Sequence, residues 1–412
     1  MELYCYQAAG APALSAIPDL PLPRLPLGAD CPERFLLRRG GGRAVFCPSD
    51  PRQLFAETED VRFLAPDSLG EIPDLPQPLL DRIQNRTLQA VDLAHPRWED
   101  SLRFQPLAGG KKRLHLLAVG DVGGTLLTAL KLLGGDVIDS VGICDVNQAA
   151  VARWCAEMGQ IAWPWDYGAL PEVEPVDLDH LFDCDVFLFA AAKAVPPVGA
   201  GGDVRMAQLA ANRPLAEHYA RLARERRFRG LFLVMSDPVD PLCRAAYLAS
   251  NRDEAGNLDH QGLLPEQIRG LGLGVMNARA AYFAKRDPRY ASFLTEGRSF
   301  GPHGQGLVLA NSIVHYDDAL SQALTAEVLS ANLRIRELGF KPFVAPAVSS
   351  GAMQLLLLLR GEWHCASLPL GDVFFGCRSR LTPLGPETEA LPLPPQLLKR
   401  LQAAESHLRA IP

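Results

Sequence analysis

The sequence has no long hydrophobic run, since its longest aliphatic stretch, "LLLLL" at 355–359, is far too short to span a bilayer. The N-terminus, "MELYCYQ", has neither a basic region nor an apolar stretch, so we expect no export signal. The nine cysteines are odd in number and include no CxxC pair, which argues against both a disulfide framework and a zinc site. We therefore expect a cytoplasmic protein with reduced cysteines, no metal site and no membrane partner.

Charge of either sign is scattered rather than clustered. The chain has 41 Lys and Arg against 47 Asp and Glu, a net charge of −6, and no basic stripe that would follow a nucleic acid backbone. Nucleic acid is therefore not an expected partner. A length of 412 residues with 48% hydrophobic and 21% charged residues is typical of a globular protein of two or three domains with a large core.

Residues 1–110 differ in composition and pattern from the rest of the chain. They contain the proline-rich stretch "IPDLPLPRLPLG", the glycine cluster "RRGGGR" and the short strand-like runs "RFLLRR" and "RAVFC". Residues 79–104 have helical spacing that predicts a helix up to Pro96. We interpret residues 1–110 as a small N-terminal appendage of unknown role, with "AGGKK" at 108–112 as a linker.

From residue 113 onward, apolar strands alternate with helices. "RLHLLAVG", "SVGICD", "DVFLFAAA" and "GLFLVMSDP" are typical of buried strands, and amphipathic or apolar helical segments lie between them. This alternation predicts an α/β fold with a doubly wound parallel sheet covered on both faces. We assign the sheet domain to 111–240 and a second, substrate-binding and catalytic domain to 241–412. A ligand is expected at the carboxyl ends of the strands.

The first strand-to-helix turn, "AVGDVGG" at 118–124, fits the pattern GxGxxG with alanine in the first position. A dinucleotide pyrophosphate needs bare backbone at a helix N-terminus, and an acid at the end of the next strand takes the ribose hydroxyls. The candidate cofactor-binding residues are Gly120, Gly123, Gly124 and Asp145. The alternative is a tight turn that binds nothing, and Asp121 would weaken binding unless it points to solvent.

The spacing beyond residue 113 resembles that of the lactate and malate dehydrogenase family. "RMAQLAAN" contains Arg205 and Asn212 at the family's interval of seven, and "SDPVD" at 236–240 corresponds to the family's "SNPVD". Arg279 precedes His303, in "GPHGQG", by 24 residues, which is the family's interval between the substrate arginine and the catalytic histidine.

The resemblance implies a Rossmann-type domain followed by an α+β C-terminal domain, with hydride transfer between NAD and a small 2-hydroxy or 2-oxo acid. His303 would move the proton, because an imidazole titrates near neutral pH. Arg279 would bind the substrate carboxylate in a bidentate manner, and Arg205 would polarise the carbonyl. Asn212 and Lys193 are further candidates for the substrate side.

Two further expectations concern the ligands. Asp145 would repel a 2′-phosphate, so NAD is expected rather than NADP. Residues 194–204, "AVPPVGAGGDV", correspond to the family's mobile lid and contain no cation for a second carboxylate, which favours a monocarboxylate substrate. By analogy with the family we also expect a homo-oligomer.

The sequence departs from the family at two site positions. Met276 stands where the family has the aspartate that orients its histidine, and Asp237 stands where it has asparagine. One hypothesis is an NAD-dependent 2-hydroxyacid dehydrogenase in which Asp237 takes over part of the missing aspartate's role. The other is a catalytically weakened relative that binds a dinucleotide and acts as a sensor or an assembly subunit.

Overall fold

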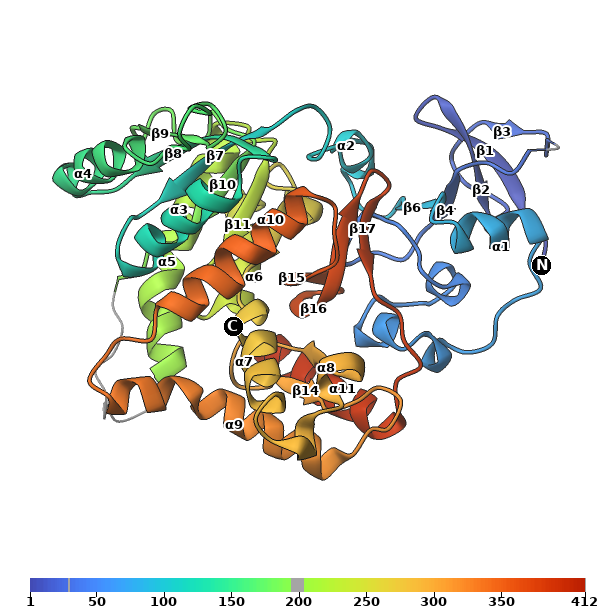
Figure 1. The fold of residues 1–412 in the computed structure, drawn as a ribbon. Helices are drawn as coiled ribbons and strands as arrows, with labels where there is room; N and C mark the ends of the chain where they lie inside the picture. The colour runs from blue at the N-terminus through green and yellow to red at the C-terminus, as the bar shows by residue number, and fades with distance from the viewer. Residues whose placement is uncertain (29, 194–203, 412) are drawn as a thin grey trace.

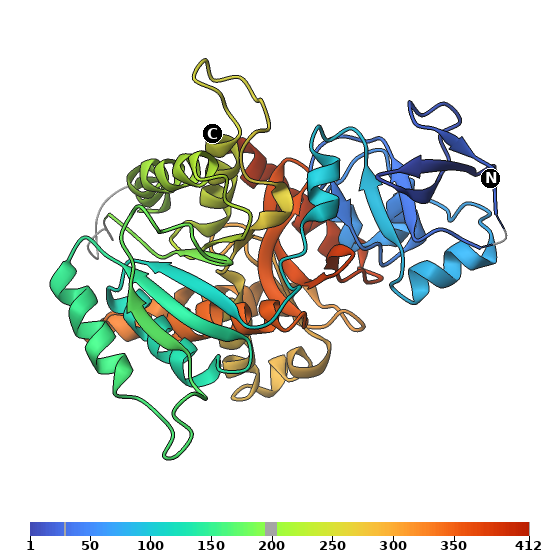
Figure 2. The ribbon, with the colours of Figure 1, turned by 90° about the horizontal axis from the view of Figure 1, so that it is seen from above.

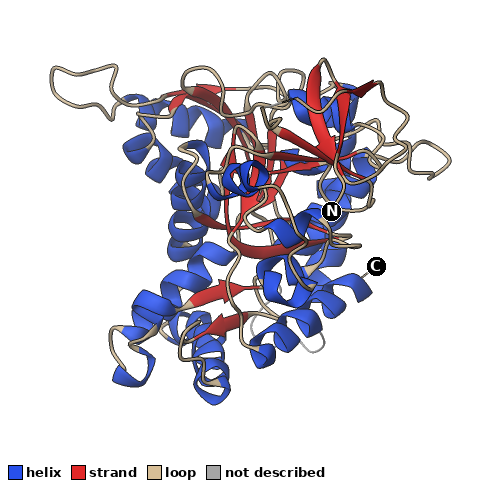
Figure 3. Cartoon of the chain, turned by 90° about the vertical axis from the view of Figure 1, so that its right-hand side faces the viewer, coloured by secondary structure: helices blue, strands red, loops and turns tan. Residues whose placement is uncertain are grey.

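The structure, a computed structural model, describes residues 1–28, 30–193 and 204–411, with the backbone alone at 204 and 205. Its strands form a six-stranded sheet near the N-terminus, a nine-stranded sheet in the main body and a separate pair. The long strands lie in the interior and most helices lie outside them (Figure 3).

The N-terminal unit is built from short strands in the order β3-β1-β2-β4-β6-β5. Their bounds are β1 Tyr4–Ala8, β2 Ala11–Ser15, β3 Arg24–Leu25, β4 Arg34–Leu37, β5 Val45–Phe46 and β6 Gln89–Asp92. Three 3-10 turns and two helices complete it: Pro51–Leu54, Val61–Leu64, Pro66–Leu69, α1 (Gln77–Gln84) and α2 (Trp98–Arg103).

The helix predicted from residue 79 up to Pro96 is wrong in its second half. α1 ends at Gln84, and residues 89–92 instead form β6, which pairs with β4 on one side and β5 on the other. All four residues of β6 are buried. Strand pairing on both edges therefore outweighs the helical spacing of the local sequence.

The main body has a continuous sheet in the order β17-β16-β15-β12-β11-β10-β7-β8-β9. Six of its strands are parallel: β7 Lys112–Leu117, β8 Ile138–Cys144, β9 Glu172–Pro175, β10 Val186–Phe189, β11 Leu231–Val234 and β12 Ile268–Gly270. The others are antiparallel: β15 His364–Leu370, β16 Val373–Thr382 and β17 Gly385–Thr388. Strand order reverses between β7 and β10, which is where a ligand crevice is expected.

Helices cover both faces of the parallel strands, as the alternation predicted. α3 (Asp121–Leu133), α4 (Gln148–Gly159) and α10 (Met353–Leu359), which a π-helical segment (Pro346–Ala352) precedes, share one apolar core with the strands. α5 (Val204–Glu225) and α6 (Val239–Ser250) share the other. Leu116 and Leu188 face the first core, whereas Leu117 and Phe187 face the second, which is the two-residue period of a strand buried on both sides.

The remaining elements complete the main body. They are α7 (Leu273–Ala284), α8 (Phe293–Glu296), the antiparallel pair β13 (Arg298–Phe300) and β14 (Val308–Ala310), α9 (Asp318–Glu337) and α11 (Pro395–Ala410), with 3-10 turns at Pro265–Gln267 and Pro288–Tyr290. The long helix α9 and the C-terminal helix α11 lie below the sheet in Figure 1.

The N-terminal unit shares a core with the antiparallel end of the large sheet. Phe35, Phe46 and Phe63 belong to the same buried apolar cluster as Leu368 and Phe375 of β15 and β16. The β15–β17 strands lie between the N-terminal unit and the parallel strands in both Figure 1 and Figure 2. The unit therefore covers one end of the main sheet.

A buried carboxylate also crosses this junction. Glu266 accepts hydrogen bonds from the Val45 backbone N–H at 2.9 Å and from the Ser101 hydroxyl at 2.8 Å, both in the N-terminal unit. Burial raises the pKa of Glu266, and these donors oppose that rise. Nearby, Arg97 donates to the carbonyl of Gly262, in the segment between α6 and β12. Among the described residues, no helix has the length and apolar character needed to cross a membrane.

Candidate functional site

The glycine turn lies between β7 and α3, where Gly120 is the N-cap of the helix. A Cβ added at Gly120 would meet no atom within 4 Å, so the backbone there is open to a ligand. A Cβ at Gly123 would lie 2.0 Å from the Ala118 carbonyl oxygen, and one at Gly124 would lie 2.2 Å from the Trp154 ring. Gly120 thus leaves room for a close approach, whereas Gly123 and Gly124 permit close packing of α3.

Two acids flank this turn. Asp145, just past β8, accepts hydrogen bonds from the backbone N–H groups of Val119 at 2.9 Å and Asn147 at 2.8 Å, which ties the ends of β7 and β8 together. Asp121 is exposed and pairs with Lys341 at 2.9 Å. The Asp121 carboxylate, whose charge opposes that of a pyrophosphate, is therefore exposed and paired with a lysine.

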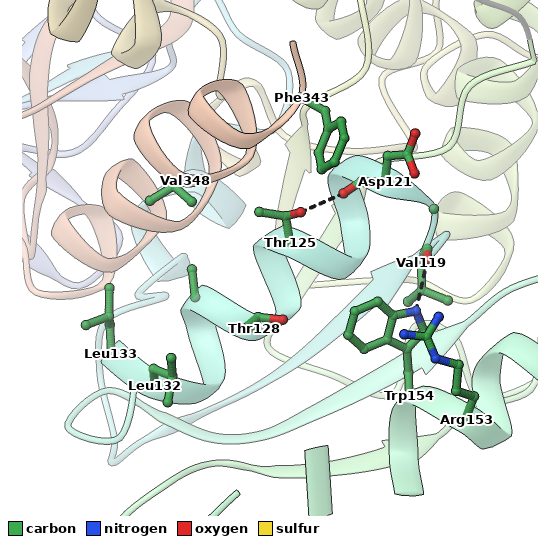
Figure 4. A pocket seen from close by; sticks show the side chains of 12 residues that line it. Val119, Asp121, Thr125, Thr128, Leu132, Leu133, Arg153, Trp154, Phe343 and Val348 are labelled. Carbon is green, nitrogen blue, oxygen red and sulfur yellow. Dashed lines mark hydrogen bonds between the residues drawn. The ribbon is translucent and has the colours of Figure 1, made fainter. Parts of the chain in front are cut away.

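A cavity of about 670 Å³ begins at the glycine turn and extends along α3. Figure 4 shows its walls: α3 along one side, Trp154 and Arg153 of α4 on another, and Phe343 and Val348 opposite. The Trp154 indole N–H donates to the Val119 carbonyl at 3.1 Å and so joins α4 to the turn. Val119, Gly120 and Asp121 of the glycine turn line this cavity, whereas Asp145 does not.

His303 lies in the loop between β13 and β14, and its imidazole pairs with Asp237. The Nδ1 atom is 2.9 Å from Asp237 Oδ1, in the segment that follows β11. Because an ionised carboxylate can only accept, the proton of this bond lies on Nδ1. The His303 side chain is 13% exposed and that of Asp237 41%, so the pair lies at the mouth of a site.

Asn212 ties the neighbouring strand ends together. Its side chain is buried, donates to the Asp237 carbonyl at 2.8 Å and accepts from the Lys193 backbone N–H at 2.9 Å. The structure therefore brings Lys193, Asn212, Asp237 and His303 to one edge of the sheet. The Lys193 side chain is exposed there.

Arg279 lies on α7, half-buried, with Nη1 3.8 Å from the sulfur of Met276. Burial lowers the pKa of Arg279, and the charge of Asp237 opposes that change. Met276 is 2% exposed and packs in the apolar core beneath α7. The Arg205 side chain and the proposed lid at 194–203 lie outside the described residues.

The sequence analysis missed Asp240. This acid is buried in the first turn of α6, where it accepts a hydrogen bond from the His303 backbone N–H at 3.1 Å. Its signal in the sequence is a single carboxylate within the apolar stretch "PVDPLCRAA". Within the described ranges, no three His, Cys, Asp or Glu side chains are grouped so as to hold a metal ion.

Ala118 has a φ of 77°, in the region that favours glycine, at the place where the nucleotide-binding pattern has its first glycine. A non-glycine residue in this conformation lowers the free energy of unfolding by about 1 kcal/mol or more. Glycine avoids that cost, but its more flexible unfolded chain loses more entropy on folding, which cancels part of the gain. We expect Ala118→Gly to raise the free energy of unfolding by about 0.5 kcal/mol, measured by urea denaturation.

The matched control is Ala152→Gly, on the exposed face of α4, which we expect to lower the stability by about 1 kcal/mol. Equal destabilisation by both substitutions would show that Ala118 is not strained.

Comparisons with known proteins address the fold. No protein-family model matches the chain, and no curated protein matches it by sequence. Solved structures do match. The minor L-lactate dehydrogenase of Enterococcus mundtii is 19% identical, with a TM-score of 0.59 over 73% of this chain and 97% of that one.

Two malate dehydrogenases match equally well. That of Picrophilus torridus is 16% identical, with a TM-score of 0.58 over 73% of this chain and 96% of its own. That of Archaeoglobus fulgidus, solved in complex with NADH, is 16% identical, with a TM-score of 0.56 over 72% and 97%. The chain therefore has the fold of the lactate and malate dehydrogenases, a Rossmann-type sheet domain followed by their C-terminal domain, at an identity low enough to mark it as divergent.

Proposed function

We propose that this protein is an NAD-dependent oxidoreductase that transfers hydride between nicotinamide and a small 2-hydroxy or 2-oxo acid. The observation that carries the proposal is the 2.9 Å contact between His303 Nδ1 and Asp237 Oδ1, a partly exposed pair in a dehydrogenase fold. The fold alone supports many chemistries, so the proposal depends on this pair.

The pair meets the requirement for proton transfer. Oxidation of an alcohol to a ketone releases the hydroxyl proton together with the hydride, and His303 Nε2 accepts that proton in one direction and returns it in the other. Asp237 holds the Nδ1–H tautomer and stabilises the imidazolium that forms. Asp237 thus does from the end of β11 what an aspartate at position 276 would do from α7.

The substrate side is assigned by charge. Arg279 presents the planar guanidinium that binds a carboxylate in a bidentate manner, and Arg205 is proposed to polarise the carbonyl oxygen. Asn212 is proposed to act on the substrate through Asp237, since its amide already bonds to the Asp237 carbonyl. Lys193 is the remaining candidate for a polar substituent. The absence of a cation in 194–204 of the sequence favours a monocarboxylate.

The glycine turn fits a dinucleotide. Gly120 leaves its backbone open at the N-terminus of a 13-residue helix, where N–H groups and the helix dipole favour a pyrophosphate. Each Asp145 oxygen accepts one backbone N–H and retains a lone pair for a ribose hydroxyl. When bound, NAD supplies the hydride acceptor. Asp145 would repel the extra phosphate of NADP.

The first test is a reduced-cofactor absorbance assay of the purified protein against a panel of 2-oxo acids. We expect turnover with NADH, weaker turnover with NADPH, and higher kcat/KM for pyruvate and larger apolar 2-oxo monocarboxylates than for oxaloacetate. NADPH preferred over NADH would contradict the role of Asp145. NADH binding without turnover of any acid would favour the alternative, a catalytically weakened sensor or assembly subunit, for which Met276 is the specific argument.

The second test separates a rewired site from a decayed one. We expect Asp237→Asn to lower kcat by about a hundredfold or more, because the imidazole loses the carboxylate that fixes its tautomer. His303→Ala should abolish turnover, and Arg279→Ala should mainly raise KM.

Substitutions at position 276 are the control. Met276→Leu conserves volume in the core and should leave kcat within about twofold, and Met276→Asp should bring no gain while Asp237 is present. A rise in kcat with Met276→Asp, together with wild-type kcat in Asp237→Asn, would show that Asp237 has not replaced the family's aspartate.

We also propose that the protein is a cytoplasmic homo-oligomer. All nine cysteines are free thiols, which suits a reducing compartment. Large apolar side chains stay exposed beside the cavity along α3, on α3, α10 and the segment before the π-helix: Leu132, Leu133, Phe340, Val344 and Met353.

Sedimentation equilibrium should therefore give a mass above that of one chain. Leu133→Lys should shift it toward the monomer, whereas Leu258→Lys, at a similarly exposed leucine in the segment between α6 and β12, should not. A monomeric wild-type protein would remove this proposal.

A further inference from the structure

Asp240 is a buried carboxylate with two donors from different parts of the fold. Its Oδ2 atom accepts the His303 backbone N–H at 3.1 Å, and its Oδ1 atom accepts the hydroxyl hydrogen of Ser367, in the middle of β15. Asp240 is 4% exposed and Ser367 2%. Burial raises the pKa of Asp240, and the two hydrogen bonds oppose that rise, so the bonds favour the charged form in an apolar surrounding.

Two glycines allow these elements to come so close. A Cβ at Gly270, on β12, would lie 2.6 Å from Val239 Cγ1 and 2.8 Å from the Cβ of Ser367. A Cβ at Gly272 would lie 2.9 Å from the Cβ of His303. Without side chains at these two positions, α6 packs directly on the sheet and the His303 loop packs directly on the start of α7. Asp240 can therefore reach both β15 and the loop.

The His303 loop needs such an anchor. Gly301, Gly304 and Gly306 all have positive φ values, of 84°, 138° and 89°, so the loop is built from residues with a large conformational freedom when unfolded. Gly301 donates its N–H to the Gly376 carbonyl at 2.8 Å, which docks one end of the loop on β16. At the histidine itself, the hydrogen bond from the His303 backbone N–H to Asp240 holds the main chain of the loop.

Asp237 and Asp240 lie three residues apart, and each forms a hydrogen bond with a different part of His303. Asp237 holds the ring of His303 at Nδ1, and Asp240 holds its backbone N–H. The ring of a histidine moves with its main chain, and small misplacements of a proton-transfer group are costly in rate. Both contacts are therefore needed to direct Nε2 along one line.

We propose that Asp240 and Ser367 are positioning residues for the reaction: together they fix the main chain of His303, so that its ring stays aligned between Asp237 and the substrate. They do not touch the substrate. This inference rests on the proposed function, but the placement of His303 that it describes can be measured without turnover.

The central variant is Ser367→Ala, which removes the donor to Asp240 Oδ1 with little change of volume. In amide hydrogen exchange followed by NMR, we expect the His303 backbone N–H to exchange at least about tenfold faster than in the wild type, because Asp240 loses its second anchor. The downfield resonance of the imidazole Nδ1–H should broaden or disappear. In kinetics, kcat should fall by about tenfold with KM within about twofold.

Two controls accompany it. Ser379→Ala removes another buried hydroxyl, on the adjacent strand β16, with no hydrogen bond to the site, and should leave the exchange of His303 and kcat unchanged. Ser367→Thr keeps the hydroxyl and should retain slow exchange. Asp240→Asn places an amide N–H against one of the two groups that donate to Asp240. It should therefore speed the exchange of the His303 N–H more than Ser367→Ala does. If Asp240→Asn does not fold, the result for Ser367→Ala decides alone.

The outcomes separate the positioning role from the proposed function. If Ser367→Ala leaves the exchange of His303 and the Nδ1–H resonance as they are in Ser379→Ala, the positioning role is wrong, whatever the activity. If the wild type reduces no 2-oxo acid but exchange responds as expected, the placement of His303 stands and the proposed function falls. A lower melting temperature with unchanged exchange at His303 would show a role in stability only.

Discussion

The pairing of β12 with β15, at Gly270 and Ser367, is the constraint on which the rest of the main body depends. β12 is the last of the parallel strands, and β15 begins the antiparallel strands that support the N-terminal unit. At this one register position, Gly270 lets α6 approach the sheet, and Ser367 bonds to the carboxylate that α6 carries. At the junction between the two halves of the sheet, Ser367 therefore also bonds to the carboxylate that holds the main chain of His303.

The proposed site differs in where its negative charge lies from the arrangement that the sequence resemblance implied. A carboxylate on α7 would need to replace Met276, which is buried in an apolar cluster, whereas Asp237 lies at the open end of β11. A charge at position 237 would repel a substrate carboxylate if it stood alone. In the structure its carboxylate accepts a hydrogen bond from the His303 ring, and its negative charge favours the charged form of Arg279.

The N-terminal unit completes the apolar core at one end of the main sheet, which its composition did not predict. Its aromatic side chains, Phe35, Phe46 and Phe63, bury apolar surface of β15 and β16 that would otherwise face water. The carboxylate of Glu266 connects it to the main body a second time. The inner face of the unit is therefore packed against the main body of this chain.

The sequence alone determined the parallel sheet, its covering helices and the glycine turn, because these depend on short-range patterns: apolar runs of strand length, helical periodicity, and glycines at a fixed interval. It also singled out His303 and Asp237, each in its own segment. The tertiary structure decided that the two are partners, since 66 residues separate them along the chain and no local pattern encodes their distance. For the same reason only the fold revealed β6 in place of a helix, the packing roles of Gly123 and Gly124, and the bonds from Asp240 to His303 and Ser367, all of which depend on neighbours that are remote in sequence.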